Sequence, residues 1–380
     1  MVNSGQTNKT QPTILVIGGL GYIGSHMVEE LLGQGHRVVI LDDLSTGFRE
    51  SYCGGKLITG CLGDPGVLDS VFGYNRIDAV MHFAAFSLVG ESVTDPLKYY
   101  KNNIAKTIEL LSAMKKFGVN RFIFSSTAAV YGEPLATPIT EEHPCLPTNP
   151  YGTTKLTIEQ LLRDCAAAFD FRYIALRYFN AAGAHPSGQI GERHNPESHL
   201  IPLVLKVATG EREAISIYGT DYPTPDGTCV RDYIHVNDLT RAHLLALTRL
   251  LAGGDSGCFN LGNSKGYSVR EVIEIARKVT GHSIPVIAAA RRSGDPSILV
   301  AGSDKIRRVL GWKPQFEDLE TIIQTAWRWH HRTAPEKKRT DSHAPGQPVP
   351  NRNTAPDTML EQPACSHEIY ARRVKTGEQT

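Results

Sequence analysis

The chain has 380 residues, of which 41% are hydrophobic, and its 40 basic and 39 acidic side chains almost cancel. This length predicts a large core in two lobes, and the charge balance argues against a nucleic-acid or anionic-membrane partner. No apolar run approaches the roughly 20 residues of a membrane span, and the start of the chain lacks a signal-peptide core. The seven scattered cysteines favour reduced thiols over disulfides or a zinc framework. We therefore expect a cytoplasmic protein without a metal site.

The first predicted unit is a strand, a glycine turn and a helix. Residues 13–17 are apolar and mostly β-branched, as in a buried parallel strand. They lead into Gly18-Gly19-Leu20-Gly21-Tyr22-Ile23-Gly24, and an amphipathic stretch follows to about Leu32. In this context a glycine turn lets the backbone approach a pyrophosphate at the helix N-terminus. The alternative is a glycine turn that binds no ligand.

A carboxylate follows the second predicted strand, which covers residues 37–41. Asp42 can accept hydrogen bonds from the adenosine ribose hydroxyls and would repel a 2′-phosphate. No basic residue comes directly after it. NAD is therefore favoured over NADP.

Strands and helices continue to alternate as far as residue 180. Such alternation predicts an α/β fold with a Rossmann-type doubly wound parallel sheet. The expected strands are 57–60, 78–83, 121–125 and 173–176, and the expected helices are near 65–73, 96–117 and 151–170. After Asn180, glycine, proline and histidine accumulate and the rhythm breaks. We expect a flexible N-terminus at 1–12, the Rossmann domain at 13–180 with a returning segment at 229–251, a smaller mixed α/β domain at 181–331 and a disordered tail at 332–380.

A tyrosine and a lysine stand four residues apart at the start of one predicted helix. Asn149 is a good N-cap and Pro150 suits the first helical position, so Tyr151 and Lys155 share a helix face. A phenol titrates near 10, and a positive charge nearby lowers that pKa toward the range of a useful base. The spacing alone is weak evidence, because Tyr52 and its fourth neighbour Lys56 repeat it across a glycine loop.

Hydroxyl side chains end the predicted strand that precedes this helix. The run Phe122-Ile123-Phe124 is followed by Ser125, Ser126 and Thr127. Ligands of open α/β sheets bind at the carboxyl ends of the strands, so Thr127 can share the site of Tyr151. The alternative is a hydroxyl that only caps the following turn.

Together these motifs resemble the extended short-chain dehydrogenase/reductase superfamily, and most closely its UDP-galactose (UDP-glucose) 4-epimerases. The resemblance covers about residues 13–331. Five further segments carry it: Gly21-Tyr22-Ile23-Gly24-Ser25-His26, Val89-Gly90-Glu91-Ser92-Val93, Arg177-Tyr178-Phe179-Asn180-Ala181-Ala182-Gly183-Ala184, Asp226-Gly227-Thr228-Cys229-Val230-Arg231-Asp232-Tyr233-Ile234-His235-Val236 and Trp312-Lys313-Pro314.

The resemblance implies an isomerase that epimerises a UDP-hexose at carbon 4 with tightly bound NAD. Tyr151 would be the base, Lys155 would orient the nicotinamide ribose and tune the phenol, and Thr127 would bond the sugar 4-hydroxyl. Hydride would pass to NAD, the 4-keto sugar would turn over about its bond to the diphosphate, and hydride would return to the other face. A homodimer through 96–117 and 151–170 is expected by analogy.

The resemblance also implies two sets of binding residues. The cofactor positions are Tyr151 and Lys155 together with Gly18, Gly21, Tyr22, Ile23, Gly24, Asp42, Phe83, Ala84, Asn102 and Tyr178. The UDP-sugar positions, which would form the smaller domain's site, are Thr127, Asn180, His199, Leu200, Tyr218, Arg231, Arg292, Asp295 and Leu299. Two arginines suit a diphosphate through forked hydrogen bonds, and a carboxylate suits ribose hydroxyls.

Three positions depart from the family pattern. Cys61 replaces an Asp that faces the adenine, Ser87 replaces a Lys found near the cofactor in some members, and His199 replaces an Asn near the pyrophosphate. Related epimerases of N-acetylhexosamine, uronic acid or pentose nucleotides stay open as alternatives. A 4,6-dehydratase is disfavoured because Ala128-Ala129 stand where its acidic pair would be. A non-catalytic NAD-binding protein is disfavoured by the intact Tyr, Lys and Thr.

Overall fold

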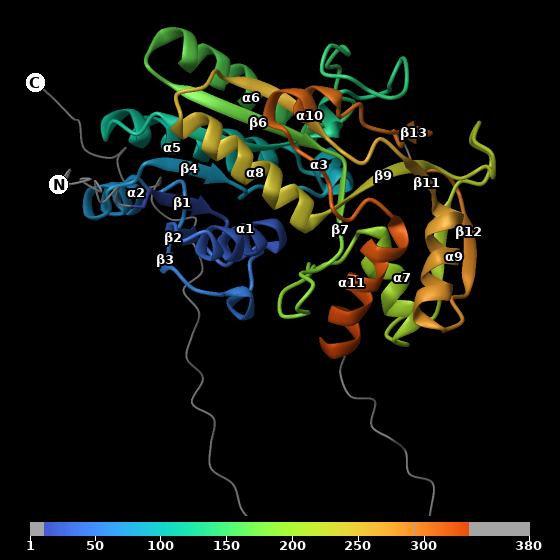
Figure 1. Cartoon of the computed structure of the whole chain (residues 1–380). Helices are drawn as coiled ribbons and strands as arrows, with labels where there is room; N and C mark the ends of the chain where they lie inside the picture. Colours follow the sequence, from blue (N-terminus) through green and yellow to red (C-terminus); the bar gives the residue numbers. More distant parts are fainter. Residues whose placement is uncertain (1–10, 293, 334–380) are drawn as a thin grey trace, which may run out of the picture. The chain divides into compact units, whose positions relative to one another are not determined.

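A parallel sheet of seven strands organises the first part of the chain, in the order β10-β6-β5-β4-β1-β2-β3 (Figure 1). Its strands are β1 (Thr13–Ile17), β2 (Arg37–Asp42), β3 (Lys56–Thr59), β4 (Ala79–His82), β5 (Arg121–Thr127), β6 (Arg172–Tyr178) and β10 (Gly257–Leu261). The computed structural model describes residues 11–292 and 294–333. Nearly all of the predicted flexible N-terminus and disordered tail lie outside the described residues.

Helices cover both faces of this sheet because its strands are apolar on both sides. Ile14 and Val16 of β1 pack with α1 (Tyr22–Gly33) and α8 (Val236–Leu251). The alternate residues Leu15 and Ile17 join the opposite core. The helices that contribute to that core are α2 (Pro65–Tyr74), α5 (Lys106–Lys116) and α6 (Pro150–Ala168). Since side chains alternate across a strand, the two cores lie on opposite faces, and the predicted doubly wound sheet is confirmed.

The helix expected over 96–117 is divided into three pieces. It consists of α4 (Pro96–Tyr99), the π-helical segment η2 (Tyr100–Ala105) and α5, and the short α3 (Val89–Thr94) precedes it. Asp95 caps α4 by accepting a hydrogen bond from the backbone N of Lys98. A π-helical turn widens the helix and is often found at functional sites. The 3₁₀ turns η1 (Arg49–Ser51) and η3 (Ala128–Val130) lie in loops after β2 and β5.

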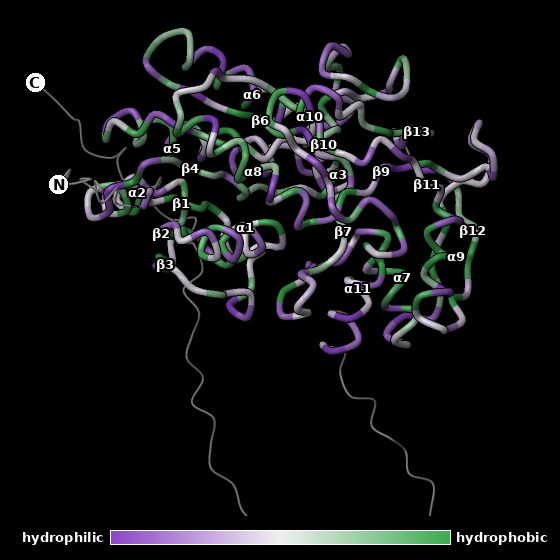
Figure 2. Tube along the Cα trace, viewed as in Figure 1, coloured by the Kyte–Doolittle hydropathy of each residue, from purple (hydrophilic) through white to green (hydrophobic). Residues whose placement is uncertain are grey.

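The chain after β6 builds a second, smaller region around its own core. One sheet contains β7 (Asn180–Ala182), β9 (Val230–His235), β11 (Gly266–Ser268) and β13 (Ile298–Leu299), and β8 (Ile215–Tyr218) pairs with β12 (Val286–Ala289). The helices that pack here are α7 (Leu200–Ala208), α9 (Val269–Thr280) and α11 (Leu319–Thr333). Figure 2 shows hydrophobic stretches in α7 and α9, which face each other in this core.

The chain passes between the two regions more than once. After β9 it returns as α8, which packs on α1, and then as β10, which pairs with β6. β10 was not among the predicted strands, and α10 (Asp304–Leu310) packs against it. All the described residues belong to one compact unit. The domain bounds therefore stay a prediction.

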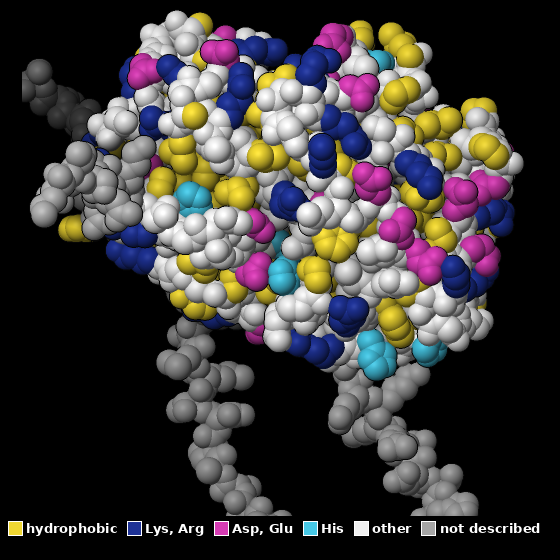
Figure 3. Space-filling view, in the orientation of Figure 1, with side chains coloured by type: hydrophobic (Ala, Val, Ile, Leu, Met, Phe, Trp, Pro, Cys, Tyr) yellow, Lys and Arg dark blue, Asp and Glu magenta, His cyan; other side chains and the backbone are white. Residues whose placement is uncertain are grey.

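The face of the molecule in Figure 3 carries charges of both signs together with apolar side chains. Figure 3 shows acidic and basic side chains interspersed on the face in view. None of the helices within the described residues is long and apolar enough to cross a membrane.

Candidate active site

A pocket lies at the carboxyl ends of β1 and β4, where the strand order of the large sheet reverses. Ligands of doubly wound sheets bind at such a switch point. Six of the predicted cofactor positions line the pocket: Gly18, Gly21, Asp42, Phe83, Ala84 and Asn102. Residues that were not predicted also line it, including Asp43, Phe86 and Lys106.

The glycine turn is shaped so that only glycine fits at two positions. Gly18 has a φ of +76°, and a Cβ there would lie 2.7 Å from the backbone N of Ala84. A Cβ on Gly24 would lie 2.1 Å from the carbonyl oxygen of Gly18. The turn therefore brings the N-terminus of α1 close to β1 and leaves backbone exposed to a pyrophosphate, so these residues fit a dinucleotide.

Two neighbouring carboxylates stand at the end of β2. Asp42 accepts hydrogen bonds from the backbone N of Leu20 at 2.9 Å and of Leu44 at 2.8 Å, and burial raises the pKa of its carboxyl. Asp43 is exposed in the pocket, 3.9 Å from the ammonium of Lys106. The position of Asp43 directly after Asp42 was the signal that could have identified it. A pair of carboxylates here disfavours a 2′-phosphate further.

The predicted catalytic residues lie at the carboxyl end of β5 and in the first two turns of α6. The side chain of Asn149 caps α6 by accepting a hydrogen bond from the backbone N of Gly152 at 2.9 Å. Lys155, which is 4% exposed, donates to the carbonyl oxygen of Ser125 at 2.8 Å, and its Nζ lies 6.0 Å from the centre of the Tyr151 ring. The hydroxyl of Thr127 accepts a hydrogen bond from the backbone N of Ala129 at 3.1 Å, so it caps the turn η3, and it also lies close enough to the phenol of Tyr151 to affect its pKa. The three side chains thus share one small volume.

The pKa of Tyr151 differs from the expectation. Burial raises it above its usual value of 10, although the hydrogen bond with Thr127 opposes this change. Burial also lowers the pKa of Lys155 to about 7, against the attraction of Glu159. Lys155 does not lower the pKa of Tyr151 as expected, because burial penalises both the phenolate and the ammonium ion. The chain by itself therefore holds the tyrosine protonated.

A buried ionic network lies one helical turn beyond Lys155. Glu159 accepts hydrogen bonds from the hydroxyl of Ser126 at 2.5 Å and from Nε of Arg177 at 2.9 Å. Arg177 also donates to the hydroxyl of Tyr131 at 2.9 Å. These residues were not predicted, although the position of Glu159 four residues after Lys155 was a signal.

The other predicted cofactor positions are not among the residues that line the pocket. They are Tyr22, Ile23, Gly24, Tyr151, Lys155 and Tyr178. The hydroxyl of Tyr22 donates to the carbonyl oxygen of Gly183 at 2.7 Å, so that side chain joins α1 to the segment after β7. Tyr178 ends β6 beside the catalytic group, and burial raises its pKa.

The predicted substrate residues lie mainly on the second region. Arg231 of β9 pairs with Asp295, so each partly neutralises the other. The guanidinium of Arg292 stacks 3.9 Å from the ring centre of Tyr218. Leu299 stands opposite Arg231 in the pairing of β13 with β9. The remaining positions are Asn180, which begins β7, His199, which stands at the N-cap position of α7 without a side-chain hydrogen bond to it, and Leu200, the first residue of that helix.

Comparisons with known proteins identify the family to which the chain belongs. Residues 14–262 match the family model described as NAD dependent epimerase/dehydratase family. The UDP-glucose 4-epimerase of Halalkalibacterium halodurans is 55% identical over 317 residues, which are 83% of this chain and 95% of that protein.

Two crystal structures of UDP-glucose 4-epimerases are similar to the whole described unit. The Brucella ovis enzyme in complex with NAD is 46% identical with a TM-score of 0.81, and the match covers 83% of this chain and 97% of that one. The Bifidobacterium longum enzyme in complex with NAD+ and UDP is 41% identical with a TM-score of 0.81, over 84% and 98% of the two chains. The chain therefore belongs to the NAD dependent epimerase/dehydratase family, among its UDP-glucose 4-epimerases.

Proposed function

We propose that this chain interconverts UDP-glucose and UDP-galactose by NAD-dependent epimerisation at carbon 4. The observation that supports the proposal is that Tyr151, Lys155 and Thr127 lie close together at the same edge of the parallel sheet as the glycine-lined pocket. The similar enzymes solved with NAD, or with NAD+ and UDP, support the same cofactor and nucleotide here.

The proton of the sugar 4-hydroxyl is handled by the tyrosine. Tyr151 accepts it in one direction and returns it in the other, and Thr127 holds the hydroxyl in line through a hydrogen bond. Lys155 stands on the same helix face and is fixed by the carbonyl oxygen of Ser125. NAD, when bound, supplies the hydride acceptor and donor at carbon 4 and a positive charge beside the phenol. That charge acts against the desolvation that raises the pKa of Tyr151.

The nucleotide is held by the second region. Arg231 and Arg292 offer guanidinium groups to the diphosphate, and the N-terminus of α7 at Leu200 offers backbone N–H groups to an anion. Asp295 accepts from ribose hydroxyls. Firm binding of UDP leaves the sugar ring free to present either face to the same base.

The chain also forms a homodimer in the cytoplasm. Apolar side chains are exposed along the helices expected at the interface, and such patches typically mark contact surfaces. They are Leu97, Tyr100 and Ile108 within 96–117, and Val93 in the preceding α3. The cysteines among the described residues are free thiols, as in a reducing compartment. Size-exclusion chromatography with light scattering tests the dimer.

The activity is tested with the purified chain and UDP-galactose, without added NAD. The anomeric proton signals of UDP-glucose should appear in the NMR spectrum until an equilibrium mixture is reached, with no net change in nicotinamide absorbance. In a second sample with added NAD, accumulation of NADH in proportion to that NAD would instead identify a dehydrogenase and refute the proposal.

A further inference from the structure

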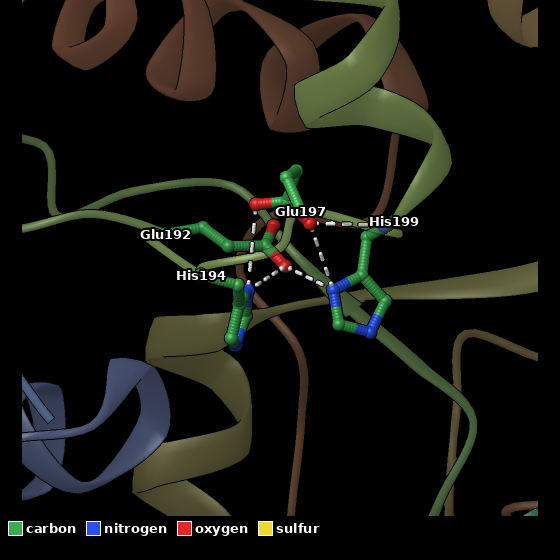
Figure 4. Close-up of side chains that lie close together, drawn as sticks. All are labelled: Glu192, His194, Glu197 and His199. Carbon is green, nitrogen blue, oxygen red and sulfur yellow. Dashed lines mark hydrogen bonds and ion pairs between the residues drawn. The ribbon is translucent and has the colours of Figure 1, made fainter. Parts of the chain in front are cut away.

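Two histidines and two glutamates converge in the loop between β7 and α7 (Figure 4). We call Glu192, His194, Glu197 and His199 the His-Glu cluster. Each residue offers one nitrogen or oxygen atom, and the four atoms all lie within 4.8 Å of one another. Figure 4 shows both imidazole rings directed toward the two carboxylates.

Three of four nitrogen–oxygen distances in the cluster are close to the edges of a metal coordination tetrahedron; the fourth is shorter, and the two histidines approach different oxygens of Glu197. Nδ1 of His194 lies 3.5 Å from Oε1 of Glu192 and 3.5 Å from Oε2 of Glu197. Nδ1 of His199 lies 2.9 Å from Oε1 of Glu192 and 3.4 Å from Oε1 of Glu197. Zinc binds imidazole nitrogen and carboxylate oxygen at about 2.0–2.2 Å, which places neighbouring ligands of a tetrahedron roughly 3.3–3.6 Å apart.

The cluster contains polar atoms that the protein itself does not satisfy. The side chains of Glu192 and Glu197 are only 5% and 3% exposed. Oε1 of Glu192 and Nδ1 of His194 are buried without a hydrogen-bond partner, so the contacts of these atoms lack hydrogen-bond geometry. A buried carboxylate oxygen beside a buried ring nitrogen, neither of them hydrogen-bonded, is typical of a cation site.

The charge of the cluster suits a divalent ion. Two buried carboxylates carry two negative charges, which two protonated histidines or one divalent ion would neutralise. The nearest arginine in the loop, Arg193, is directed elsewhere: its Nη1 lies 3.6 Å from Glu50, and its guanidinium stacks on Trp329. A doubly charged ion would neutralise both carboxylates.

Backbone donors hold one of the carboxylates in place. Oε1 of Glu197 accepts hydrogen bonds from the backbone N of Ser198 at 2.8 Å and of His199 at 2.9 Å. Tyr22 packs edge-on against the ring of His194, with 6.2 Å between ring centres. Such second contacts fix the orientation of metal ligands.

We propose that the His-Glu cluster binds one Zn²⁺ ion. Four protein ligands leave no open position, so the ion is structural and takes no part in the reaction. It ties residues 192–199 together immediately before α7 and thereby stabilises the start of that helix. Cysteine spacing gave no sign of this site, because its ligands are imidazoles and carboxylates in an irregular loop.

The proposal is tested by zinc binding to the full-length, tag-free protein with its NAD retained. After removal of metal with a chelator, titration against a chromophoric zinc indicator should give one Zn²⁺ per chain. Zn²⁺ should also raise the melting temperature, because it binds only the folded state. His194→Ala and Glu192→Gln should each weaken binding by at least about 100-fold, since loss of a contact beyond the ligands already costs about 10–100-fold.

Three comparisons separate this site from other outcomes. His185→Ala, which removes a nearby imidazole outside the cluster, should leave the zinc affinity unchanged. Co²⁺ should give intense tetrahedral visible bands without the near-ultraviolet band of a cysteine ligand, a result that does not depend on the variants folding. Three results would overturn the proposal. They are stoichiometric zinc in His194→Ala, a cysteine-ligand band with Co²⁺, and a cluster that is protonated and binds no zinc. None of these measurements uses epimerase activity, so the result is independent of the proposed function.

Discussion

The carboxylate of Glu159 and the guanidinium of Arg177 form a forked ion pair, 0% and 4% exposed, one helical turn beyond Lys155. The pair joins α6 to β6, and through Ser126 it also joins the end of β5. The two elements that carry the candidate catalytic residues, α6 and β5, are therefore connected to β6 by one buried network.

Removing one partner of this pair should be costly. Glu159→Gln leaves Arg177 buried without a counter-charge, and we expect the free energy of unfolding to fall by about 3–5 kcal/mol. Urea denaturation measures the change. Glu320→Gln breaks the exposed pair with Lys278 and should cost less than about 1 kcal/mol. Equal effects of the two variants would contradict the structural role of the buried pair.

The candidate base is tested by deleting one oxygen atom. Tyr151→Phe should fold, keep its NAD and lose at least about 100-fold in kcat, the usual scale for a general base. Tyr52→Phe is the matched control, because Tyr52 is exposed and its hydroxyl bonds only the carbonyl oxygen of Gly55. Near-normal turnover in Tyr151→Phe, measured with UDP-galactose, would remove Tyr151 from the mechanism.

Two glycines of α1 provide a matched test of the cofactor turn. In Gly24→Ala the new Cβ meets the carbonyl oxygen of Gly18 at 2.1 Å, so the turn must open and NAD should be lost on purification. A Cβ on Gly33 meets nothing within 4 Å. Gly33→Ala should therefore keep NAD and gain up to about 1 kcal/mol of stability. NAD content after acid release distinguishes the two.

Buried histidines should make the protein sensitive to acid. Burial lowers the pKa values of His26, His82 and His235 to about 3 and that of His243 to about 4, from 6.5. Below pH 6.5 the unfolded chain binds protons that the folded chain excludes, so the free energy of unfolding falls as the pH falls toward 4. Each histidine contributes about 1.4 kcal/mol per pH unit across that window.

One of these histidines can be removed to check the slope. His82→Gln keeps a polar partner for the hydroxyl of Thr107, which lies 3.0 Å from Nε2 of His82, but cannot be protonated. The dependence of unfolding free energy on pH should decrease by about 1.4 kcal/mol per pH unit between pH 6 and 4. An unchanged slope would show that His82 binds a proton in the folded state.

Sugar discrimination should depend on Leu299. This side chain is half-buried and packs against a small apolar cluster that includes Ala128, the residue after Thr127. Some epimerases that the chain resembles carry Tyr there, which leaves no room for a 2-acetamido group. We expect UDP-galactose to be the better substrate and UDP-N-acetylgalactosamine a weak one. Leu299→Tyr should increase the ratio of their kcat/KM values by a factor that corresponds to about 1–3 kcal/mol of discrimination. A constant ratio would mean that Leu299 only fills the core.

The parts of the fold that depend on local pattern were predictable from sequence. Apolar β-branched runs placed β1 and β2 within one residue of their bounds, because a strand buried on both faces is uniformly apolar. β10 was missed because Gly257 and Asn260 interrupt its apolar character, and its pairing with β6 joins residues far apart in the chain. The π-helical turn at Tyr100–Ala105 was missed because helical periodicity does not register one wider turn.

The sequence predicted those parts of the candidate site that depend on residues close together in the chain. The spacing of Tyr151 and Lys155 on α6, and the glycines before α1, are local patterns with a local physical meaning. The direction of the Tyr151 pKa shift was not predictable, because it depends on burial by the whole fold. Arg177 is likewise placed by the alignment of β6 with β5, which no short sequence window contains.

The crossing of the chain between its two regions limits how the enzyme can diversify. The second region cannot be removed as one continuous segment, because α8 and β10 lie between its parts in the sequence. These two elements belong to the large sheet and to the helices that cover it. Exchanging the whole second region between related enzymes would also remove β10 from the large sheet. New sugar specificities in this architecture must therefore arise by point changes and loop changes, such as at Leu299, rather than by recombination of intact domains.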